Sequence, residues 1–398
     1  MKLLYVCADP GIALDGFKGA SVHVRQTIGA LADAGLEISV VAARPGQWHD
    51  PRCESLAVEP RQKTALHPTA METEQAALAR VPQMVRAAVE GAEAGGYDAV
   101  YERYSLWSTV GLAVAERMDI PLVLEINAPL VDEARRYRGL RLGSLAAAIE
   151  ETNIAGAERV FCVSSTLCRH AARLSSRPEK IELFPNVVDL DAFSPATEDP
   201  AGDAPLIVFL GSLKPWHGVL DLLEAFHRLS RRLAGPRLRF IGDGPLRSRL
   251  EEEIAARDLG ARVEVTGGVA HDEIPALLAE AQIGVAPYPK LDNFYFSPIK
   301  LVEYAAAGLA IVATETGDYR RHLHADEHLL EVPPGATAQL AAALEHLATN
   351  PALRRRLARN AREAAERHLS LDSARERLVA ALHTLIARRG PLREELAG

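Results

Sequence analysis

Cysteine is scarce in this chain of 398 residues, which contains only four. Cys7, Cys53, Cys162 and Cys168 form no CxxC pair and have no histidines nearby at zinc spacing. Neither a disulfide framework nor a structural metal site is therefore expected. Reduced thiols and a cytoplasmic location fit this pattern.

Long apolar runs are also missing. No stretch of about 18 uninterrupted apolar residues occurs, so no transmembrane helix is expected. The apolar run after Met1 is too short for a signal peptide and is typical of a first strand. Any membrane contact would be peripheral.

The chain carries no excess of positive charge. Its 45 basic and 53 acidic residues give a net charge of -8, so no general attraction to nucleic acid or to anionic lipid is expected. Hydrophobic residues make up 48% and charged residues 25%, which argues against long disorder. At roughly 100–200 residues per domain, the length predicts two domains.

Short apolar runs bounded by turn residues alternate with longer helical segments, which is typical of parallel α/β units. Strands are expected at 3–7, 38–42, 99–103, 122–126 and 159–163, and again at 205–211, 237–242, 263–267, 283–288 and 310–314. Residues 336–388 are predicted to be helical, with no further strand.

The two halves are separated by FPNVVDLDAFSPATEDPAGDAP, whose Pro, Asp, Gly and Ser content is typical of a linker. We predict an N-terminal Rossmann-like domain over 1–190, a linker over 191–204 and a C-terminal Rossmann-like domain over 205–374. A helix over about 375–398 is expected to complete the first domain. Two doubly wound α/β domains facing each other form a cleft, and such sheets bind ligands at the carboxyl ends of their strands.

A glycine-rich loop follows the first strand. It contains Gly11, Gly16 and Gly19 and leads into a helix predicted to begin around Ser21. Free N–H groups there suit an anionic or hydroxyl-rich ligand. The spacing is not GxGxxG, and the second strand lacks the expected acidic residue, which weakens a dinucleotide interpretation. A plain strand-to-helix turn is the alternative.

The second half has comparable loops. GSLKPWHG places Lys214 and His217 at a helix N-terminus, where a cation beside free amides suits a diphosphate. IGDGPLRSRL and VTGGVAHDE supply further glycine turns, and Gly267 and Gly268 would let a flat base lie against the backbone. Each of these loops, taken singly, is also explained as an ordinary turn.

Residues 286–314 are the most informative segment. An aromatic loop, Phe294–Phe296, precedes Ser297-Pro298 at the start of a helix that carries Lys300 and Glu303 at i, i+3 spacing. A carboxylate in that position can accept two ribose hydroxyls. The alternative is a surface Lys–Glu pair that contributes a few tenths of a kcal/mol.

The order GSLKPWHG, IGDGPLRSRLEE, VTGGVAHDEIPALLAEAQIGVAPYP and FSPIKLVEYAAAGLAIVAT resembles the C-terminal half of the retaining glycosyltransferases of family 4, which have the GT-B fold. In the first half, GASVHV, VSSTL and FPNVVDLDAFSP resemble the same family at the matching points. The resemblance covers nearly the whole chain.

The resemblance implies a nucleotide-sugar site in the C-terminal domain, with the base near Gly268 and Val269. Glu303 matches the second carboxylate of an E-x7-E motif, which holds the ribose. The first carboxylate falls on Tyr295, so this chain has SPxKxxEY in place of the full motif. The sugar hydroxyl would then be read by the loop backbone or by Asp292.

The family's basic pair for the diphosphate falls on Ser212 and His217, with Lys214 displaced between them. Lys214, Lys300 and the helix start at 297–299 are the expected replacements. Asn127 occupies the place of a histidine beside the reacting sugar and is expected to position groups by hydrogen bonds.

The predicted site residues fall into three groups. Catalytic roles are expected for Asn127 and Lys214. Acceptor binding is expected for His23, Glu102, Arg103 and Asn127, with a structural ion pair as the alternative for Glu102 and Arg103. Donor binding is expected for Gly19, Ser212, Lys214, His217, Gly244, Gly268, Val269, Tyr295, Phe296, Ser297, Pro298, Ile299, Lys300 and Glu303.

The resemblance implies an enzyme that transfers a sugar, with retention, from a nucleotide diphosphate sugar to a hydroxyl of a small molecule or glycan. A UDP-sugar is the expected co-substrate, with no other cofactor, no metal and no nucleic acid. A nucleotide-sugar epimerase of the same fold, or a non-catalytic nucleotide-sugar-binding protein, is the alternative. Arginines within 353–363 indicate a solvated helix face or a weak peripheral membrane contact. The acceptor and the oligomeric state stay open.

Overall fold

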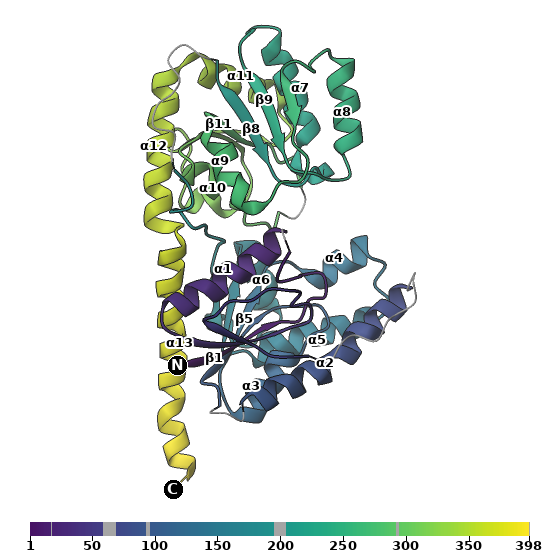
Figure 1. The fold of residues 1–398 in the computed structure, drawn as a ribbon, viewed down its shortest axis with the longest axis vertical. Coiled ribbons are helices and arrows are strands. Elements are labelled where there is room, and N and C mark those ends of the chain that lie inside the picture. The colour runs from purple at the N-terminus through teal and green to yellow at the C-terminus, as the bar shows by residue number, and fades with distance from the viewer. Residues whose placement is uncertain (17, 59–68, 93–95, 195–203, 292–293, 398) are drawn as a thin grey trace. The chain divides into compact units, whose positions relative to one another are not determined.

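The computed structural model of the chain describes residues 1–16, 18–58, 69–92, 96–194, 204–291 and 294–397, with side chains described up to 388. Asp292, expected to read a sugar hydroxyl, and most of the predicted linker lie outside the described residues. The chain forms two compact units (Figure 1). Unit 1 comprises Met1–Pro185 and Ala374–Gly398, and unit 2 comprises Asn186–Ser373.

The boundary between the units lies earlier than the sequence indicated. Residues 186–190 were assigned to the first domain, but they belong to unit 2. There Val188 pairs with Ser370, and its carbonyl accepts a hydrogen bond from the Leu371 N–H at 2.9 Å. These backbone contacts hold the segment next to the residues that directly follow helix α12 (Pro351–His368).

Unit 1 is built on a seven-stranded sheet in which all pairs are parallel. Its order is β3 (Cys53–Ser55), β2 (Glu37–Ala42), β1 (Lys2–Cys7), β4 (Ala99–Arg103), β5 (Leu122–Ile126), β6 (Arg159–Cys162) and β7 (Ile181–Leu183). The helices are α1 (Gly19–Asp33), α2 (Ala70–Ala92), α3 (Val110–Met118), α4 (Leu130–Tyr137), α5 (Gly143–Gly156), α6 (Ser165–Arg173) and α13 (Leu371–Ala397).

The central strands of unit 1 are buried on both faces because helices cover both sides of a parallel sheet. On one face, Leu3 and Tyr5 of β1 pack with Ile28 of α1. The same cluster includes Leu378, Leu382 and Leu385 of α13, whose spacing places them along one stripe of the helix. The last helix is therefore part of the unit 1 core.

Unit 2 repeats the architecture with a six-stranded parallel sheet. The order is β10 (Val263–Val265), β9 (Arg237–Ile241), β8 (Leu206–Leu210), β11 (Ile283–Ala286), β12 (Ala310–Thr314) and β13 (Leu329–Val332). Its helices are α7 (Val219–Ser230), α8 (Arg247–Ala256), α9 (Ile274–Ala279), α10 (Ile299–Ala306), α11 (Thr337–Thr349) and α12 (Pro351–His368).

The predicted fold class, two doubly wound α/β domains, is confirmed. Strand order reverses direction between β1 and β4 in unit 1, and between β8 and β11 in unit 2. Loops that follow such neighbouring strands lead to opposite faces of the sheet and leave a ligand-binding crevice at the carboxyl edge. These edges are where site residues are expected.

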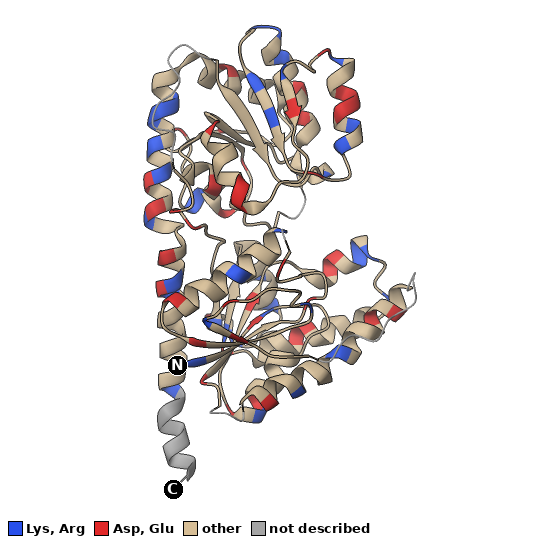
Figure 2. Ribbon diagram, viewed as in Figure 1, with Lys and Arg blue, Asp and Glu red and all other residues tan. Residues whose placement is uncertain are grey.

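Two sequence expectations concern the surface and the thiols. None of the four cysteines, all of which are described, forms a disulfide bond. In the part of the chain that the structure describes, no helix combines the length and the apolar character needed to cross a membrane. The arginines of 353–363 lie on α12 among acidic side chains (Figure 2), and Arg362 pairs with Glu366 at 2.6 Å.

Candidate functional site

The loops at the carboxyl edge of the unit 2 sheet lie against one another. A Cβ atom added at Gly244, after β9, would lie 2.7 Å from the Leu213 backbone nitrogen in the loop after β8. Gly268, after β10, is next to Asp243 of the β9 loop. Val269 is partly buried against the core. These turns therefore form one continuous surface at the edge.

Lys300, near the start of α10, is buried beneath this edge with 7% of its surface exposed. Its Nζ lies 4.0 Å from the centroid of the Phe209 ring and 5.2 Å from that of Tyr288. The buried Nζ has no hydrogen-bond partner among the described residues. Burial lowers its pKa to about 7. An unpaired buried ammonium is costly, so an anionic group bound here would satisfy it.

Gly211, the residue after β8, lies beside the Lys300 ammonium and has no side chain to cover it. The glycine has φ +126, a conformation that side chains rarely adopt, and an added Cβ would lie 3.3 Å from Nζ. Any larger residue at 211 would therefore crowd the ammonium. The glycine after β8 therefore leaves space directly beside the Lys300 ammonium.

Glu303 lies one helical turn after Lys300 and is 5% exposed. Its carboxylate accepts no hydrogen bond from the described residues. Burial raises its pKa to about 7, while the charge of Lys300 opposes that rise. The two side chains are not an exposed surface pair, because both are buried. That alternative from the sequence is wrong.

His217 is neutral at physiological pH. Its Nδ1 donates to the Ser212 carbonyl at 2.6 Å, which leaves the lone pair on Nε2. Burial, together with the charge of Lys300, lowers its pKa to about 4. His217 therefore offers a hydrogen-bond acceptor, whereas the positive charge of this loop comes from Lys214. The Lys214 Nζ lies 5.1 Å from the centroid of the Trp216 ring.

Tilted and edge-to-face ring contacts connect the aromatic loop before α10 to Tyr288. Tyr295 packs on Phe296 with centroids 4.2 Å apart, Phe296 contacts Phe294, and Phe294 contacts Tyr288. Tyr288 in turn faces Lys300. Tyr295, which occupies the place of a carboxylate in the family motif, is thus part of an aromatic cluster.

Ser297 accepts hydrogen bonds from Asn186, the first residue of unit 2. Its hydroxyl accepts a hydrogen bond from the Asn186 N–H at 3.0 Å, and its carbonyl accepts one from the Asn186 side chain at 3.2 Å. Pro298 is the N-cap residue and Ile299 the first residue of α10. These contacts fix the helix start and, with it, the position of Lys300.

In unit 1 the structure gathers three predicted residues around one that sequence reasoning missed. Glu125, at the end of β5, accepts hydrogen bonds from His23 at 2.7 Å, from Arg103 at 3.0 Å and from Asn127. The signal for Glu125 was a charged residue inside the apolar run LVLEI. His23 lies in the first turns of α1, Arg103 is the last residue of β4 and Asn127 follows β5, so three separate segments meet at the carboxyl edge of the sheet.

Glu102 does not join this cluster. Its side chain points to the opposite face of β4 from that of Arg103, and it is 1% exposed. There it accepts hydrogen bonds from the Ser108 hydroxyl and from the Gly111 N–H at 2.8 Å. Burial raises the pKa of Glu102 to about 7. Its contacts tie β4 to α3, so neither acceptor binding nor the expected ion pair with Arg103 describes it.

Gly19 is the first residue of α1, two residues earlier than the predicted helix start. No neighbouring atom lies within 4 Å of a Cβ added there. The space next to Gly19 is therefore open.

A cavity of about 390 Å³ lies at the carboxyl edge of unit 1, within the size range of small-molecule sites. It lies between the loops after β1 and β2 and helix α2, and its lining includes Pro10, Arg44, Thr73 and Arg80. The described residues contain no cluster of three His, Cys, Asp or Glu side chains that could hold a metal ion.

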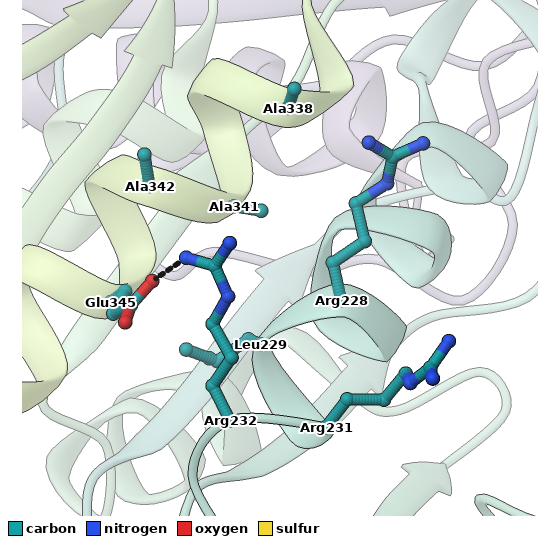
Figure 3. Close-up of a pocket in the computed structure, with 8 residues that line it drawn as sticks. All are labelled: Arg228, Leu229, Arg231, Arg232, Ala338, Ala341, Ala342 and Glu345. Carbon is teal, nitrogen blue, oxygen red and sulfur yellow. Dashed lines mark hydrogen bonds and ion pairs between the residues drawn. The ribbon is translucent and has the colours of Figure 1, made fainter.

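A second cavity of similar volume lies between α7 and α11 (Figure 3). Three arginines at the end of α7 line it, and Arg232 pairs with Glu345 at 2.7 Å. Because α7 runs back from the carboxyl edge, this groove lies at the amino edge of the sheet. It is separate from the residues around Lys300.

Comparisons with known proteins agree with this architecture. The family model for Glycosyl transferases group 1 matches residues 193–364, and the model for Glycosyltransferase Family 4 matches residues 17–192. The solved structure of the Anabaena protein Alr3699/HepE in complex with UDP-glucose is similar, with a TM-score of 0.70 and 17% identity. That likeness covers 97% of this chain and 100% of the other chain.

Two curated relatives are transferases or synthases of glycosides. Alpha-D-kanosaminyltransferase from Streptomyces kanamyceticus is 31% identical over 178 residues, which are 44% of this chain and 45% of that protein. The match thus spans less than half of that relative's length. Glycogen synthase from Mycobacterium tuberculosis H37Rv is 26% identical over 384 residues, covering 91% of this chain and 90% of that protein. The chain therefore belongs to the group 1 glycosyltransferases of family 4, with the GT-B fold that its sequence predicted.

Proposed function

We propose that this protein transfers a sugar from a nucleotide diphosphate sugar to a hydroxyl of a small molecule or glycan, with retention at the anomeric carbon. The observation that carries the proposal is the buried, unpaired ammonium of Lys300 one turn from the buried carboxyl of Glu303. A diphosphate and a ribose are adjacent in a nucleotide sugar. The ammonium suits the diphosphate, and the carboxyl one turn away suits the ribose hydroxyls.

Lys300 is assigned to the diphosphate. Charge-assisted hydrogen bonds to phosphate oxygens are about twice as strong as neutral ones, and the site is largely shielded from water. Lys214 adds a second cation at the same edge, and the start of α10 adds N–H groups. These groups stabilise the negative charge that develops on the departing diphosphate.

Glu303 is assigned to the ribose hydroxyls, and His217 to a sugar hydroxyl. The carboxylate accepts two hydrogen bonds, and the free Nε2 of His217 accepts one. The aromatic cluster with Tyr295, together with the turn at Gly268 and Val269, is assigned to the base. The likeness to a protein solved with UDP-glucose supports a UDP-sugar as the donor.

The acceptor is assigned to unit 1, at His23, Arg103 and Asn127. We propose that Asn127 positions the reacting groups and that transfer needs no metal ion, since Lys300 and Lys214 supply the positive charge. A cytoplasmic location is proposed because none of the four cysteines forms a disulfide bond.

Donor binding tests the proposal directly. UDP and UDP-glucose are titrated calorimetrically into the full chain and into Lys300→Met and Glu303→Gln. Each substitution is expected to weaken UDP binding by about 10-fold to 100-fold, because it removes a charged hydrogen-bonding group worth about 1.5–3 kcal/mol. Arg231→Met, in the groove of Figure 3, is the matched control and should bind UDP as the parent chain does.

Turnover separates a transferase from a binding protein. UDP release is measured from UDP-glucose with a panel of monosaccharide and inositol acceptors, and then from GDP- and ADP-linked sugars. Binding without release of a nucleoside diphosphate from any of these donors would contradict catalysis. Unchanged UDP affinity in Lys300→Met would contradict the site.

A further inference from the structure

Three large apolar side chains of unit 1 are exposed to solvent. Among the described residues, the large hydrophobic side chains that are exposed are Tyr137 at 60%, Leu145 at 43% and Met71 at 36%. Tyr137 is the last residue of α4, Leu145 lies in the first turn of α5, and Met71 is the second residue of α2. Exposed apolar side chains that gather in one region mark an interaction surface, whereas scattered ones need no explanation.

The three segments that carry these side chains are packed together. Glu74 of α2 is buried, and its carboxylate accepts hydrogen bonds from the backbone N–H groups of Arg141 and Leu142, both at 2.9 Å. Leu142 and Leu78 of α2 also pack against the buried cluster that contains Ala146 of α5. The turn between α4 and α5 is therefore fixed on the first turns of α2, and the exposed apolar side chains belong to one region.

The same region is rich in arginine. Residues 135–145 include no acidic residue but four exposed arginines, Arg135, Arg136, Arg138 and Arg141. Arg135 pairs with Asp132 at 3.8 Å and Arg138 with Glu133 at 3.4 Å, and such exposed pairs contribute little free energy. Arg136 lies 5.4 Å from the centroid of the Tyr137 ring, and neither Arg136 nor Arg141 forms an ion pair with a described residue. A chain with a net charge of -8 thus carries a local positive surface here.

A surface that combines apolar and basic side chains fits a lipid bilayer with anionic headgroups. Helix α4 stands out from the rest of unit 1 in Figure 1, and Figure 2 shows basic residues at its outer end. Aromatic and leucine side chains can enter the boundary between headgroups and acyl chains, while arginine side chains reach the lipid phosphates. A nucleic acid would pair with the arginines but would leave Leu145 and Met71 without apolar contact.

We propose that this α4–α5 surface, formed by Met71, Tyr137, Leu145 and the four arginines of 135–141, docks unit 1 onto a bilayer that contains anionic lipids. The inference goes beyond the proposed function and does not depend on it. The apolar side chains supply contact with the acyl boundary, and the arginines supply an attraction that salt screens. Neither contribution is large alone, so docking should need both.

The test measures binding of the full chain to vesicles by co-flotation. One vesicle type is phosphatidylcholine alone, and the other mixes phosphatidylcholine with phosphatidylserine at two to one. The chain is expected to bind the mixed vesicles more tightly, and the difference should shrink as salt is added. Arg136→Gln/Arg141→Gln should weaken binding to the mixed vesicles about 25-fold, since each arginine near an anionic surface contributes about fivefold.

A second variant removes apolar contact and keeps every charge. Tyr137→Ser/Leu145→Ser should weaken binding to the mixed vesicles about tenfold, because the exposed parts of both side chains leave the acyl boundary. Arg355→Gln/Arg356→Gln is the matched control, since it removes two exposed arginines from α12 in unit 2. It should bind the vesicles within about twofold of the parent chain if the α4–α5 surface supplies the attraction. Circular dichroism checks that all variants keep the fold.

Three results would overturn the assignment. The first is equal weakening by Arg355→Gln/Arg356→Gln, which would place the contact on α12, and the second is unchanged binding of Tyr137→Ser/Leu145→Ser. The third is a parent chain that binds neither vesicle but forms a dimer by light scattering, which the serine variant dissociates. The surface would then bind a second copy of the chain. UDP affinity, measured on the same variants, should equal that of the parent, so a failure of UDP binding would contradict the proposed function and leave the docking surface standing.

Discussion

The Lys300 ammonium and the Glu303 carboxyl are one helical turn apart, and burial moves the pKa of each to about 7, from opposite directions. The free protein is therefore poised between charged and neutral forms at physiological pH. A bound diphosphate favours charged Lys300, and bound ribose hydroxyls favour charged Glu303. Donor binding should consequently be linked to proton uptake and release.

UDP affinity is expected to be greatest near pH 7. Above that pH, Lys300 is neutral in the free protein and must take up a proton, so affinity falls by up to about tenfold per pH unit. Below it, Glu303 must release a proton, so affinity falls again. Calorimetry in buffers of different ionisation enthalpy measures both effects between pH 5 and pH 9.

Uridine and the variant Lys300→Met distinguish the decline in affinity above pH 7 from the decline below it. Uridine lacks the diphosphate, so its affinity should not decline above pH 7 but should still decline below it. The affinity of Lys300→Met for UDP should likewise not decline above pH 7. An alkaline decline that survives in Lys300→Met would assign the proton to another group.

Lys300 and Glu303 were within reach of the sequence because both lie on one short helix at i, i+3 spacing. Glu125 was not, because its partners His23 and Arg103 lie 102 and 22 residues away in the chain. A carboxyl inside an apolar strand shows its contacts only when folding brings those distant residues together. The predicted strand over 99–103 implies that the adjacent Glu102 and Arg103 point to opposite faces of the sheet, but the sequence could not show which of the two contacts Glu125.

Among the elements, the strands with strong apolar runs were predicted and three short edge strands were missed. The predicted strands correspond to β1, β2, β4, β5, β6 and β8–β12, most of which are buried apolar runs, although β10 is itself a three-residue edge strand. Strands β3, β7 and β13 have only three or four residues and mix charged with apolar side chains. Their place at the sheet edges, which needs pairing on one side only, explains why no strong pattern marks them.

The close contact between the loops after β8 and β9 predicts the effect of Gly244→Ala. The new methyl group would lie 2.7 Å from the Leu213 backbone, which must shift and carry Lys214 with it. We expect a loss of about 1–3 kcal/mol in the free energy of unfolding, as overpacked sites show, and weaker UDP binding. Denaturant titration and calorimetry measure the two effects.

Gly260→Ala provides the matched control for this element. No atom lies within 4 Å of a Cβ at Gly260, and its φ is not positive. Its stability should stay within about 0.5 kcal/mol of the parent chain or rise slightly. If both variants behave alike, the packing of the two loops does not constrain the donor site.

At the scale of the whole molecule, the path of the chain makes unit 2 an insertion into unit 1. Unit 1 is closed by α13, whose Leu378, Leu382 and Leu385 enter the core formed by the first strands and α1. Each unit has its own core, so each is expected to unfold as a separate cooperative transition.

Calorimetric scanning of the full chain should therefore resolve two unfolding transitions. UDP should raise the midpoint temperature of only one of them. At 100 times its dissociation constant, UDP stabilises the unit that binds it by about 2.7 kcal/mol. Leu382→Ala, which removes a buried side chain of α13, should lower the other transition by about 2–5 kcal/mol in stability. At the same UDP concentration, Lys300→Met, whose UDP affinity is expected to be about 10-fold to 100-fold lower, should be stabilised by only about 0.4–1.4 kcal/mol. The transition affected by Leu382→Ala should stay in place. A UDP shift in that same transition would mean that the nucleotide binds unit 1, and the assignment of the donor to Lys300 and Glu303 would be wrong.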